Sequence, residues 1–352
     1  MRLLVSTRKA LVVLEERDGA WTQVEEHFAG IPVTFTLEDP RTGTLFAALD
    51  HGHWGQKLHR RRVGEDWVEL TAPAFAKERE ASVENLWCLA HGTPEQPGRL
   101  WAGTNPGALF RSDDDGDTWV LVDSLWDHPH RADWFGGGRD TPGIHSILVD
   151  PADPKRVLIG ISCGGVYETC DDGQAWTVRN AGLHADFLPS PDAEVGHDPH
   201  LLSWCTSSPE VVWQQNHCGV FVSRDRGCTW TDVSGESARF GFAIVADPDN
   251  PDVAWTVPAV GDHARHAIGA ALQVCRTDDG GTSWRALTAG LPQQSAYDLV
   301  FRHALALQGS ALAFGSTTGN LFVSTDRGET WSCPLHHLPP IYAVTFSMQG
   351  SE

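Results

Sequence analysis

Histidines and one aspartate give this sequence its clearest capacity for chemistry. They stand in three short segments, GIHSI, GHDPH and QNHCG, and comprise His145, His197, Asp198, His200 and His217. Imidazole nitrogens and carboxylate oxygens are ligands that Zn, Mn, Fe and Ni take in proteins. We therefore predict that these residues converge on a divalent transition metal ion, whose identity the sequence does not specify.

Two interpretations without a metal ion stay open for the same residues. Histidines in loops often form hydrogen bonds with backbone groups, and no HExxH spacing fixes two ligands on one element. The side chains could then form a polar ligand pocket or a structural network. Cys163 in SCGG and Cys218 in NHCG occupy similar segments. Three roles stay open for them: soft metal ligands, a reactive thiol pair, or buried free thiols.

A second set of residues has side chains suited to ligand contacts. Aromatic rings can stack on a sugar or an aromatic ligand, and the run 136–138 of three glycines could be the hinge of a lid. For the aromatic residues, packing onto the rim of the protein is the alternative. The ligand-binding candidates are Trp126, Arg131, Trp134, His51, His53, His263, His266 and Tyr297. No residue is singled out as catalytic.

An internal repeat identifies the elements that must position these residues. SDDDGDTW at 112–119 returns at 169–176, 223–230, 277–284 and 324–331 in the pattern [S/T]-x-D-x-G-x-[T/S/A]-W. Two degenerate copies end at Trp21 and Trp67, so seven units follow one another at a period of about 50 residues. The residues with a structural role in this pattern are Asp114, Gly116, Trp119, Asp171, Trp176, Asp225, Trp230, Asp279, Trp284, Asp326 and Trp331.

Each copy has the composition of a tight turn between two strands. The Ser or Thr hydroxyl and the Asp carboxylate can hydrogen-bond to the turn backbone, and the Gly permits positive φ. A calcium loop would need more oxygen ligands and a closing Glu, so we assign these carboxylates to the scaffold.

This turn resembles the Asp-box, or BNR, repeat of β-propeller proteins. Members of that family include sialidases, xyloglucanase-like and other glycosyl-hydrolase-like proteins, sortilin-like receptors and photosystem assembly factors. The chain is similar to the bacterial cytosolic members, for which the resemblance implies no particular activity, because this fold hosts many functions.

The repeat predicts an all-β fold, a single seven-bladed β-propeller over 1–352 built from four-stranded antiparallel blades. The first unit begins at RLLVST, which matches the second strand of the other units, and the tail IYAVTFS matches an inner strand. The C-terminal strand should therefore complete the N-terminal blade and close the ring. The expected blades are 1–24 with 341–347, 33–70, 84–121, 144–179, 200–233, 241–287 and 296–333.

In this arrangement the Asp-containing turns and the candidate site lie on opposite faces. The connections between blades and the turns between second and third strands share the face at the mouth of the central channel, and most of the 17 histidines fall in them. His145 and His200 stand at or just before the starts of adjacent inner strands, and Tyr297 stands at the start of another. Loops on a rigid scaffold commonly carry function, so we place the site on this face.

Composition narrows the range of partners. A net charge of -20 and the absence of a Lys/Arg block disfavour binding to nucleic acid or to an anionic membrane. No apolar run approaches the roughly 20 residues of a membrane span, and charged residues interrupt the N-terminal segment. Eight cysteines without a CxxC pair fit a reducing compartment, so we expect a cytoplasmic protein. Nothing indicates a nucleotide cofactor or an oligomeric state.

These features favour a pocket that binds a divalent metal ion and a small polar ligand or carbohydrate, as in a metal-dependent hydrolase or oxidoreductase. A non-catalytic platform for protein or ligand binding is the first alternative. The second is a glycoside hydrolase, which needs two paired carboxylates. A sialidase is disfavoured, because the resemblance implies six blades, an Arg triad and an Arg-Ile-Pro motif, whereas GIPV at 30–33 lacks the Arg.

Overall fold

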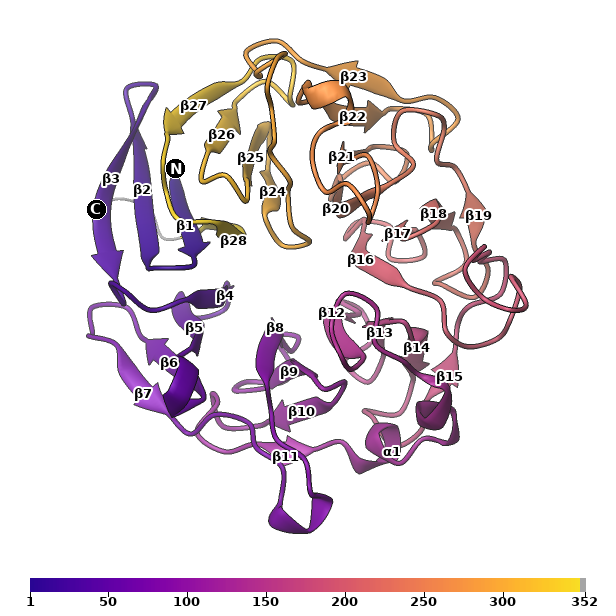
Figure 1. Ribbon diagram of the computed structural model, residues 1–352. Coiled ribbons are helices and arrows are strands. Elements are labelled where there is room, and N and C mark those ends of the chain that lie inside the picture. The colour runs from indigo at the N-terminus through magenta and orange to yellow at the C-terminus, as the bar shows by residue number, and fades with distance from the viewer. Residues whose placement is uncertain (349–352) are drawn as a thin grey trace.

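The chain folds into a closed ring of seven four-stranded antiparallel sheets, shown in Figure 1. The computed structural model describes residues 1–348. Each sheet is one blade, and its strands follow one another outward from the centre of the ring. The innermost strands are β4 (Val33–Asp39), β8 (Asn85–His91), β12 (Gly143–Val149), β16 (Pro199–Trp204), β20 (Gly241–Ala246), β24 (Leu305–Gln308) and β28 (Ile341–Ser347). The predicted seven-bladed propeller is confirmed.

The remaining strands complete each blade in the same order. The second strands are β1 (Arg2–Thr7), β5 (Thr44–Asp50), β9 (Leu100–Asn105), β13 (Val157–Ser162), β17 (Val212–Asn216), β21 (Ala254–Pro258) and β25 (Ala311–Gly315). The third strands are β2 (Leu11–Arg17), β6 (Gln56–Arg61), β10 (Leu109–Ser112), β14 (Gly165–Thr169), β18 (Gly219–Ser223), β22 (Val274–Thr277) and β26 (Leu321–Ser324). The outer strands are β3 (Ala20–His27), β7 (Val68–Leu70), β11 (Val120–Leu121), β15 (Thr177–Val178), β19 (Thr231–Asp232), β23 (Arg285–Leu287) and β27 (Ser332–Leu335).

Helical segments among the described residues are short and lie in the connections. They are α1 (Asp123–Trp126), η1 (Gly52–Trp54), η2 (Lys77–Arg79), η3 (Pro129–Asp133) and η4 (Ile268–Ala270). In residues 1–348, no helix combines the length and the apolar character that crossing a bilayer requires.

The two ends of the chain meet in one blade. Strand β28 pairs antiparallel with β1, with Leu3 opposite Phe346 and Val5 opposite Val344. This pairing occupies the free edge that β1 would otherwise present, and a closed ring leaves fewer unpaired backbone groups. Closure by the C-terminal strand is therefore as predicted.

The inner strand of the seventh blade begins later than expected. It was predicted near Tyr297, but β24 starts at Leu305. The apolar side chains of Leu299 and Val300 are buried, which explains the strand-like pattern, yet the segment before β24 forms a loop. Within it the side chain of Asp298 accepts a hydrogen bond from Ser316 at 2.6 Å, so local polar contacts replace a continuous ladder.

The core lies between the blades. Every residue of β13, VLIGIS, is buried, because each sheet is covered on both faces and the usual alternation of polar and apolar residues is lost. Phe46 of β5 and Phe110 of β10 belong to one buried cluster across two blades. Tryptophans join blades as well: Trp230 Nε1 donates to the Arg179 carbonyl of the preceding blade at 2.7 Å.

The repeated turn is closed by its own side chains. Asp114 accepts hydrogen bonds from the Ser112 hydroxyl at 2.8 Å, the Thr118 amide at 2.9 Å and the Thr118 hydroxyl at 2.7 Å. The Gly116 amide donates to the Ser112 hydroxyl at 2.9 Å, and Gly116 has a φ of 84°. The hydroxyl-to-carboxylate and glycine-to-hydroxyl bonds recur at Asp171, Asp225, Asp279 and Asp326.

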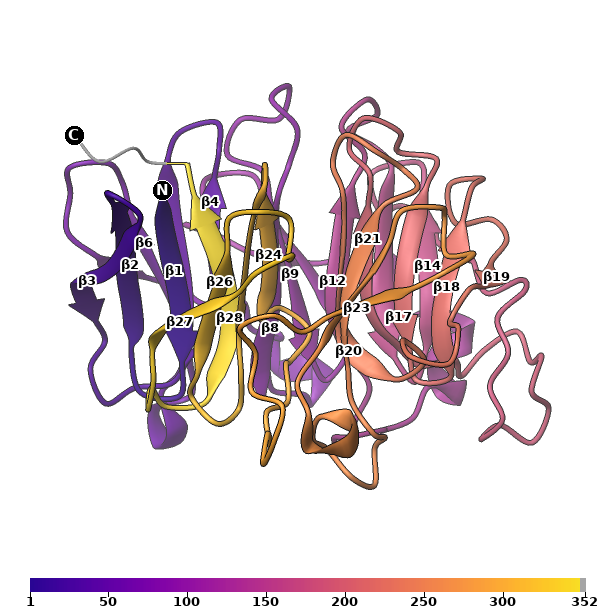
Figure 2. The ribbon, with the colours of Figure 1, turned by 90° about the horizontal axis from the view of Figure 1, so that it is seen from above.

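The antiparallel order of strands divides the connections between two faces of the disc seen edge-on in Figure 2. Each repeated turn joins a third strand to a fourth strand. The turns between second and third strands, and the connections that enter the inner strands, therefore lie at the opposite end of the blades. That second face carries the candidate site.

Candidate functional site

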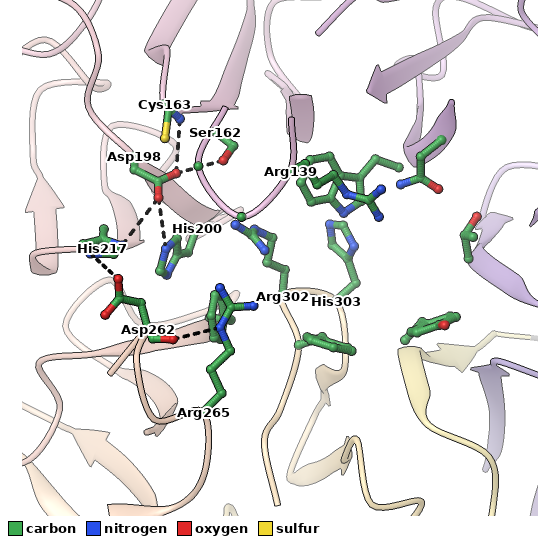
Figure 3. Close-up of a pocket in the computed structure, with 18 of the residues that line it drawn as sticks. Arg139, Ser162, Cys163, Asp198, His200, His217, Asp262, Arg265, Arg302 and His303 are labelled. Atoms are coloured by element: carbon green, nitrogen blue, oxygen red, sulfur yellow. Dashed lines mark hydrogen bonds and ion pairs between the residues drawn. The ribbon is translucent and has the colours of Figure 1, made fainter. Parts of the chain in front are cut away.

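A cavity of about 770 Å³ opens on the face opposite the repeated turns, and Figure 3 shows part of its lining. All seven blades contribute residues to it, so it lies on the axis of the ring. Its charged and imidazole groups are Arg8, Arg139, Arg265, Arg302, Asp50, Glu84, Asp198, Asp262, His200, His217 and His303. A pocket of this size accommodates a small-molecule ligand.

Asp198 lies in the connection that enters β16 and is held by groups of the neighbouring blade. Its Oδ1 accepts hydrogen bonds from the Ser162 hydroxyl at 3.0 Å and the Cys163 amide at 3.2 Å. Its Oδ2 lies 3.4 Å from His200 Nε2 and 3.6 Å from His217 Nδ1. Burial alone would raise the pKa of this carboxyl, but the facing His200 and His217 rings hold its pKa well below its usual value. The group is therefore an anion with one oxygen fixed and one facing the cavity.

His200, in β16, is oriented by the next blade. Its Nδ1 lies 2.6 Å from the Gly241 carbonyl oxygen, and since a carbonyl can only accept, Nδ1 carries a proton. The ring is 2% exposed and stacks on Phe242 at 4.6 Å between centroids. Burial lowers the pKa of this imidazole despite the nearby carboxylate of Asp198. With Nδ1 turned to the Gly241 carbonyl, the ring presents Nε2 to Asp198 Oδ2.

His217 lies in the turn between β17 and β18, and its backbone amide donates to the Asp198 carbonyl at 2.9 Å. The ring packs edge-on against Phe187 and Phe240. Its Nε2 lies 3.9 Å from Asp262 Oδ2, on the side of the ring away from Asp198. The hydrogen-bonding carboxylate of Asp198, with Asp262, raises the pKa of this imidazole.

Asp198, His200 and His217 can each offer one ligand atom, and these atoms lie within 4.8 Å of one another. Ligands on one zinc ion are about 3.3 Å apart when the metal–ligand bonds are about 2.0 Å long. The separations of 3.4 Å and 3.6 Å at Asp198 Oδ2 are close to that spacing. Three of the five predicted metal ligands are thus brought together in a geometry that a metal ion fits.

His197 and His145 are not part of this cluster. The Nε2 of His197 contacts the Ala193 carbonyl at 2.7 Å, within its own loop. His145 is completely buried in β12, where its ring lies against Gly160 and its Nδ1 is 2.9 Å from the Ser146 hydroxyl. Neither lines the cavity, so their prediction as metal ligands is corrected.

The ligand-binding candidates lie outside the cavity lining as well. Trp134 is buried and its Nε1 donates to the Tyr167 hydroxyl at 3.0 Å, while Arg131 stacks on Trp126 at 3.5 Å. Aromatic packing at the rim, the alternative interpretation, accounts for these residues. Tyr297 is 63% exposed and contacts His266 rather than the cavity. The other candidates that do not line the cavity are His51, His53 and His263.

The two cysteines of the equivalent turns are free and do not form a reactive pair. Cys163 lines the cavity beside Asp198, and burial together with that carboxylate raises the pKa of its thiol to about 12. Burial also raises the pKa of Cys218. A thiol is nucleophilic and a good metal ligand as the thiolate, so neither group is activated in this environment.

Residues near the centre of the cavity were missed from the sequence. Arg302 and His303 stand in the apolar segment before β24, and Trp87 stands in β8. Arg139, in the connection before β12, and Arg265, in the connection between β21 and β22, also line the cavity and were not among the candidates. The available signal was the charged pair Arg302-His303 between apolar residues, because charged side chains are rarely buried without a partner.

Comparisons with known proteins find relatives of part of this chain. No family model matches the chain. A xyloglucanase from Paenibacillus sp is 31% identical over 204 residues, which cover 51% of this chain and 19% of the relative. The chain spans 19% to 34% of the length of the curated relatives it matches, several of which are also xyloglucanases.

Solved structures are similar at lower sequence identity. The GH74 xyloglucanase from Xanthomonas campestris superposes with a TM-score of 0.64 at 17% identity, over 95% of this chain and 52% of that chain. YCF48 from Cyanidioschyzon merolae superposes with a TM-score of 0.54 at 15% identity, over 91% and 90%. At such identities the likeness concerns the fold alone.

Proposed function

We propose that the cavity binds a divalent transition metal ion through Asp198 Oδ2, His200 Nε2 and His217 Nδ1, next to a bound carbohydrate. The observation that carries the proposal is the orientation of His200. Its proton is committed to the Gly241 carbonyl, so a lone pair faces the Asp198 anion at 3.4 Å. Two electron-rich atoms repel at this distance unless a proton or a cation lies between them, and burial disfavours the extra proton on His200.

Contacts behind the three ligand atoms support the same proposal. Metal-binding imidazoles usually donate the second ring N–H to a carbonyl or carboxylate, which fixes the ring and raises its basicity. Gly241 supplies the carbonyl for His200, and Asp262 supplies a carboxylate on the far side of His217. Ser162 and Cys163 fix the other oxygen of Asp198. Hydrogen bonds thus orient Asp198 and His200 before any ion binds, whereas the 3.9 Å between His217 Nε2 and Asp262 Oδ2 is too long for a hydrogen bond.

Hydrolysis of a carbohydrate is the chemistry that this site would serve. A divalent metal ion polarises a ligand oxygen and lowers the pKa of a water molecule. Three protein ligands leave further coordination positions for substrate, and the cavity of about 770 Å³ has room for a sugar unit. Similarity to a xyloglucanase over half of the chain supports a carbohydrate as the ligand.

A glycosidase without a metal ion is the second candidate, because Asp198 and Asp262 lie on opposite sides of the His217 ring. Such an enzyme needs one carboxyl group with a raised pKa to act as general acid. Burial acts to raise the pKa of both groups, but hydrogen bonds and the neighbouring imidazoles hold the pKa of Asp198 and of Asp262 below the usual value. This observation favours the metal-dependent alternative.

Elemental analysis of protein purified without a polyhistidine tag tests the proposal. We expect about one transition-metal ion per chain, its loss in His200→Ala and Asp198→Asn, and its retention in His53→Ala. His53 is an exposed histidine outside the cavity and controls for adventitious binding. No metal bound, with no rise in melting temperature when Zn²⁺, Mn²⁺, Fe²⁺ or Ni²⁺ is added, would contradict the proposal.

A further inference from the structure

Three arginines in the cavity lack the partners that arginines elsewhere in the molecule have. Arg139, Arg265 and Arg302 line the cavity, and none of them forms an ion pair with a described carboxylate, whereas Arg156 pairs with both Asp150 and Glu168. The guanidinium groups are always charged at neutral pH. Each of these three charges therefore lacks a direct ion pair with a described carboxylate.

Aromatic rings hold these arginines in place instead. Arg139 and Arg302 each lie 5.1 Å from the Trp87 ring centroid. Arg302 and Arg265 lie 5.2 Å and 5.7 Å from the Phe242 centroid. The negative face of an aromatic ring attracts a cation without using its N–H groups. Arg265 Nε donates to the Asp262 carbonyl at 3.2 Å, while the aromatic contacts leave the remaining guanidinium donors available for a ligand, and Figure 3 shows all three arginines around the cavity.

Of the three arginines, Arg302 has the least favourable surroundings for a charged group. Its Nε is buried and has no hydrogen-bond partner among the described residues. Burial lowers the pKa of this guanidinium to about 10, and the charges of Arg139 and Arg265 act in the same direction, while Asp198 opposes them. The group is still a cation at neutral pH. A partly buried cation whose Nε is buried without a partner is costly, and an anion from outside the protein would relieve this cost.

The charges of the cavity are balanced but unevenly distributed. Four arginines face four carboxylates in the lining, namely Arg8, Arg139, Arg265 and Arg302 against Asp50, Glu84, Asp198 and Asp262. Asp198 and Asp262 flank His217. Gln56 joins Asp50 to Glu84 by donating to the Asp50 side chain at 3.1 Å and the Glu84 carbonyl at 2.9 Å. These acceptors suit hydroxyl groups, and the arginines suit one anionic group.

From this arrangement we infer that the natural ligand is an acidic sugar, a unit of the uronic acid type, whose carboxylate binds Arg302 together with Arg139 or Arg265. Its hydroxyl groups would donate to the carboxylates of the lining. An acidic sugar would use both the arginines and the hydroxyl acceptors of the lining, whereas inorganic phosphate would use the arginines alone. The inference rests on the proposed function only in taking a carbohydrate as the ligand, and not on the metal ion.

Calorimetric titration with glucuronic acid, glucose and inorganic phosphate tests the inference. We expect the wild-type protein to bind glucuronic acid at least about tenfold more tightly than glucose, as a charge-assisted guanidinium contact implies. Phosphate should bind more weakly than glucuronic acid. Equal affinity for the two sugars, failure to bind glucuronic acid, or tighter binding of phosphate would overturn the inference.

Arginine variants locate the contact. Arg302→Gln should abolish the preference for glucuronic acid, and Arg302→Lys should retain part of it. Arg131→Gln is the matched control, because Arg131 also stacks on a tryptophan but lies outside the cavity. A preference that survives in Arg302→Gln, with an unchanged melting temperature, would contradict the assignment. Metal content measured on the same samples separates the two proposals: Asp198→Asn should lose the metal ion and still prefer glucuronic acid, whereas wild-type protein that binds no metal yet prefers glucuronic acid would refute only the metal site.

Discussion

Carboxylates gather at both ends of the propeller, but they differ in how their oxygens are used. At the repeated turn, both oxygens of Asp114 accept hydrogen bonds from Ser112 and Thr118 within the same turn. At the cavity, only Oδ1 of Asp198 is paired in this way, and Oδ2 faces two imidazoles at 3.4 Å and 3.6 Å.

Whether both carboxylate oxygens are hydrogen-bonded locally distinguishes the scaffold from the candidate site better than the number of charged residues does. SDDDGDTW is the more acidic segment, yet both oxygens of Asp114, the carboxylate that recurs in every complete copy, accept hydrogen bonds within the turn. GHDPH has a single carboxylate, that of Asp198, which is buried. Its Oδ1 is held by two hydrogen bonds, and its Oδ2 faces the cavity. Burial with unused bonding capacity costs free energy, so it indicates a position where an external partner belongs.

Asp198→Asn should have the largest effect, because it replaces an anionic ligand by a neutral amide of the same size. We expect the affinity for the metal ion to fall by more than about 100-fold, measured by competition with a chromophoric chelator. The melting temperature of the metal-free protein should change little, since the amide oxygen can still accept from Ser162 and Cys163. An unchanged metal affinity would remove Asp198 from the site.

Ser162→Ala should have an intermediate effect on the same measurement. The Ser162 hydroxyl holds Oδ1 of Asp198 at 3.0 Å without touching the proposed ion. Loss of a group that orients a ligand typically lowers metal affinity by about 10- to 100-fold. If the affinity stays at the wild-type value, the orientation of Asp198 does not depend on this hydrogen bond.

Asp114→Ala should lower the stability of the protein and leave metal binding unchanged, the reverse of what is expected for Asp198→Asn. It removes three hydrogen bonds from a solvent-exposed turn, so we expect a loss of about 1 kcal/mol in the free energy of unfolding. This corresponds to roughly 2 °C in melting temperature for a domain of this size. Metal content and sugar binding should be unchanged. Loss of metal binding without loss of stability would reverse the assignment of scaffold and site.

His184→Ala should have the smallest effect, and one that depends on pH. His184 lies in the loop before Asp198 and contacts Asp186 and Asp192, each at 2.8 Å. These contacts raise the pKa of the exposed imidazole, so its contribution to stability is present below a pH of about 6.5 and lost as pH rises through the raised pKa. Melting curves of wild type and variant should coincide at pH 8.5 and separate slightly at pH 5.5. A large difference in melting temperature between wild type and His184→Ala at pH 8.5 would contradict this role of the protonated imidazole.

The fold could be predicted from the sequence because its signal is local and repeated. Five copies of the turn carry their own hydroxyl, carboxylate and glycine, and with the two degenerate copies that end at Trp21 and Trp67 they specify the number of blades. The start of β24 escaped prediction because the buried apolar residues Leu299 and Val300 imitate a strand, while the side chain of Asp298 bonds to the neighbouring turn.

The site could be predicted only in part, because it depends on contacts between blades. Asp198, His200 and His217 were found from their residue types and their place at the ends of strands. His145 was wrongly included, since the space beside Gly160 that receives its ring is visible only in the packing of the blade. Arg302 was missed because the rings that support it, Trp87 and Phe242, come from two other blades.

Anomalous diffraction from a crystal of the full chain, recorded at the absorption edge of the metal found by elemental analysis, tests the central claim most directly. We predict a single strong anomalous peak about 2.0–2.2 Å from Asp198 Oδ2, His200 Nε2 and His217 Nδ1, absent from crystals of Asp198→Asn. A fully occupied metal ion elsewhere in the molecule, or an anomalous map without a peak among these three side chains, would contradict the account.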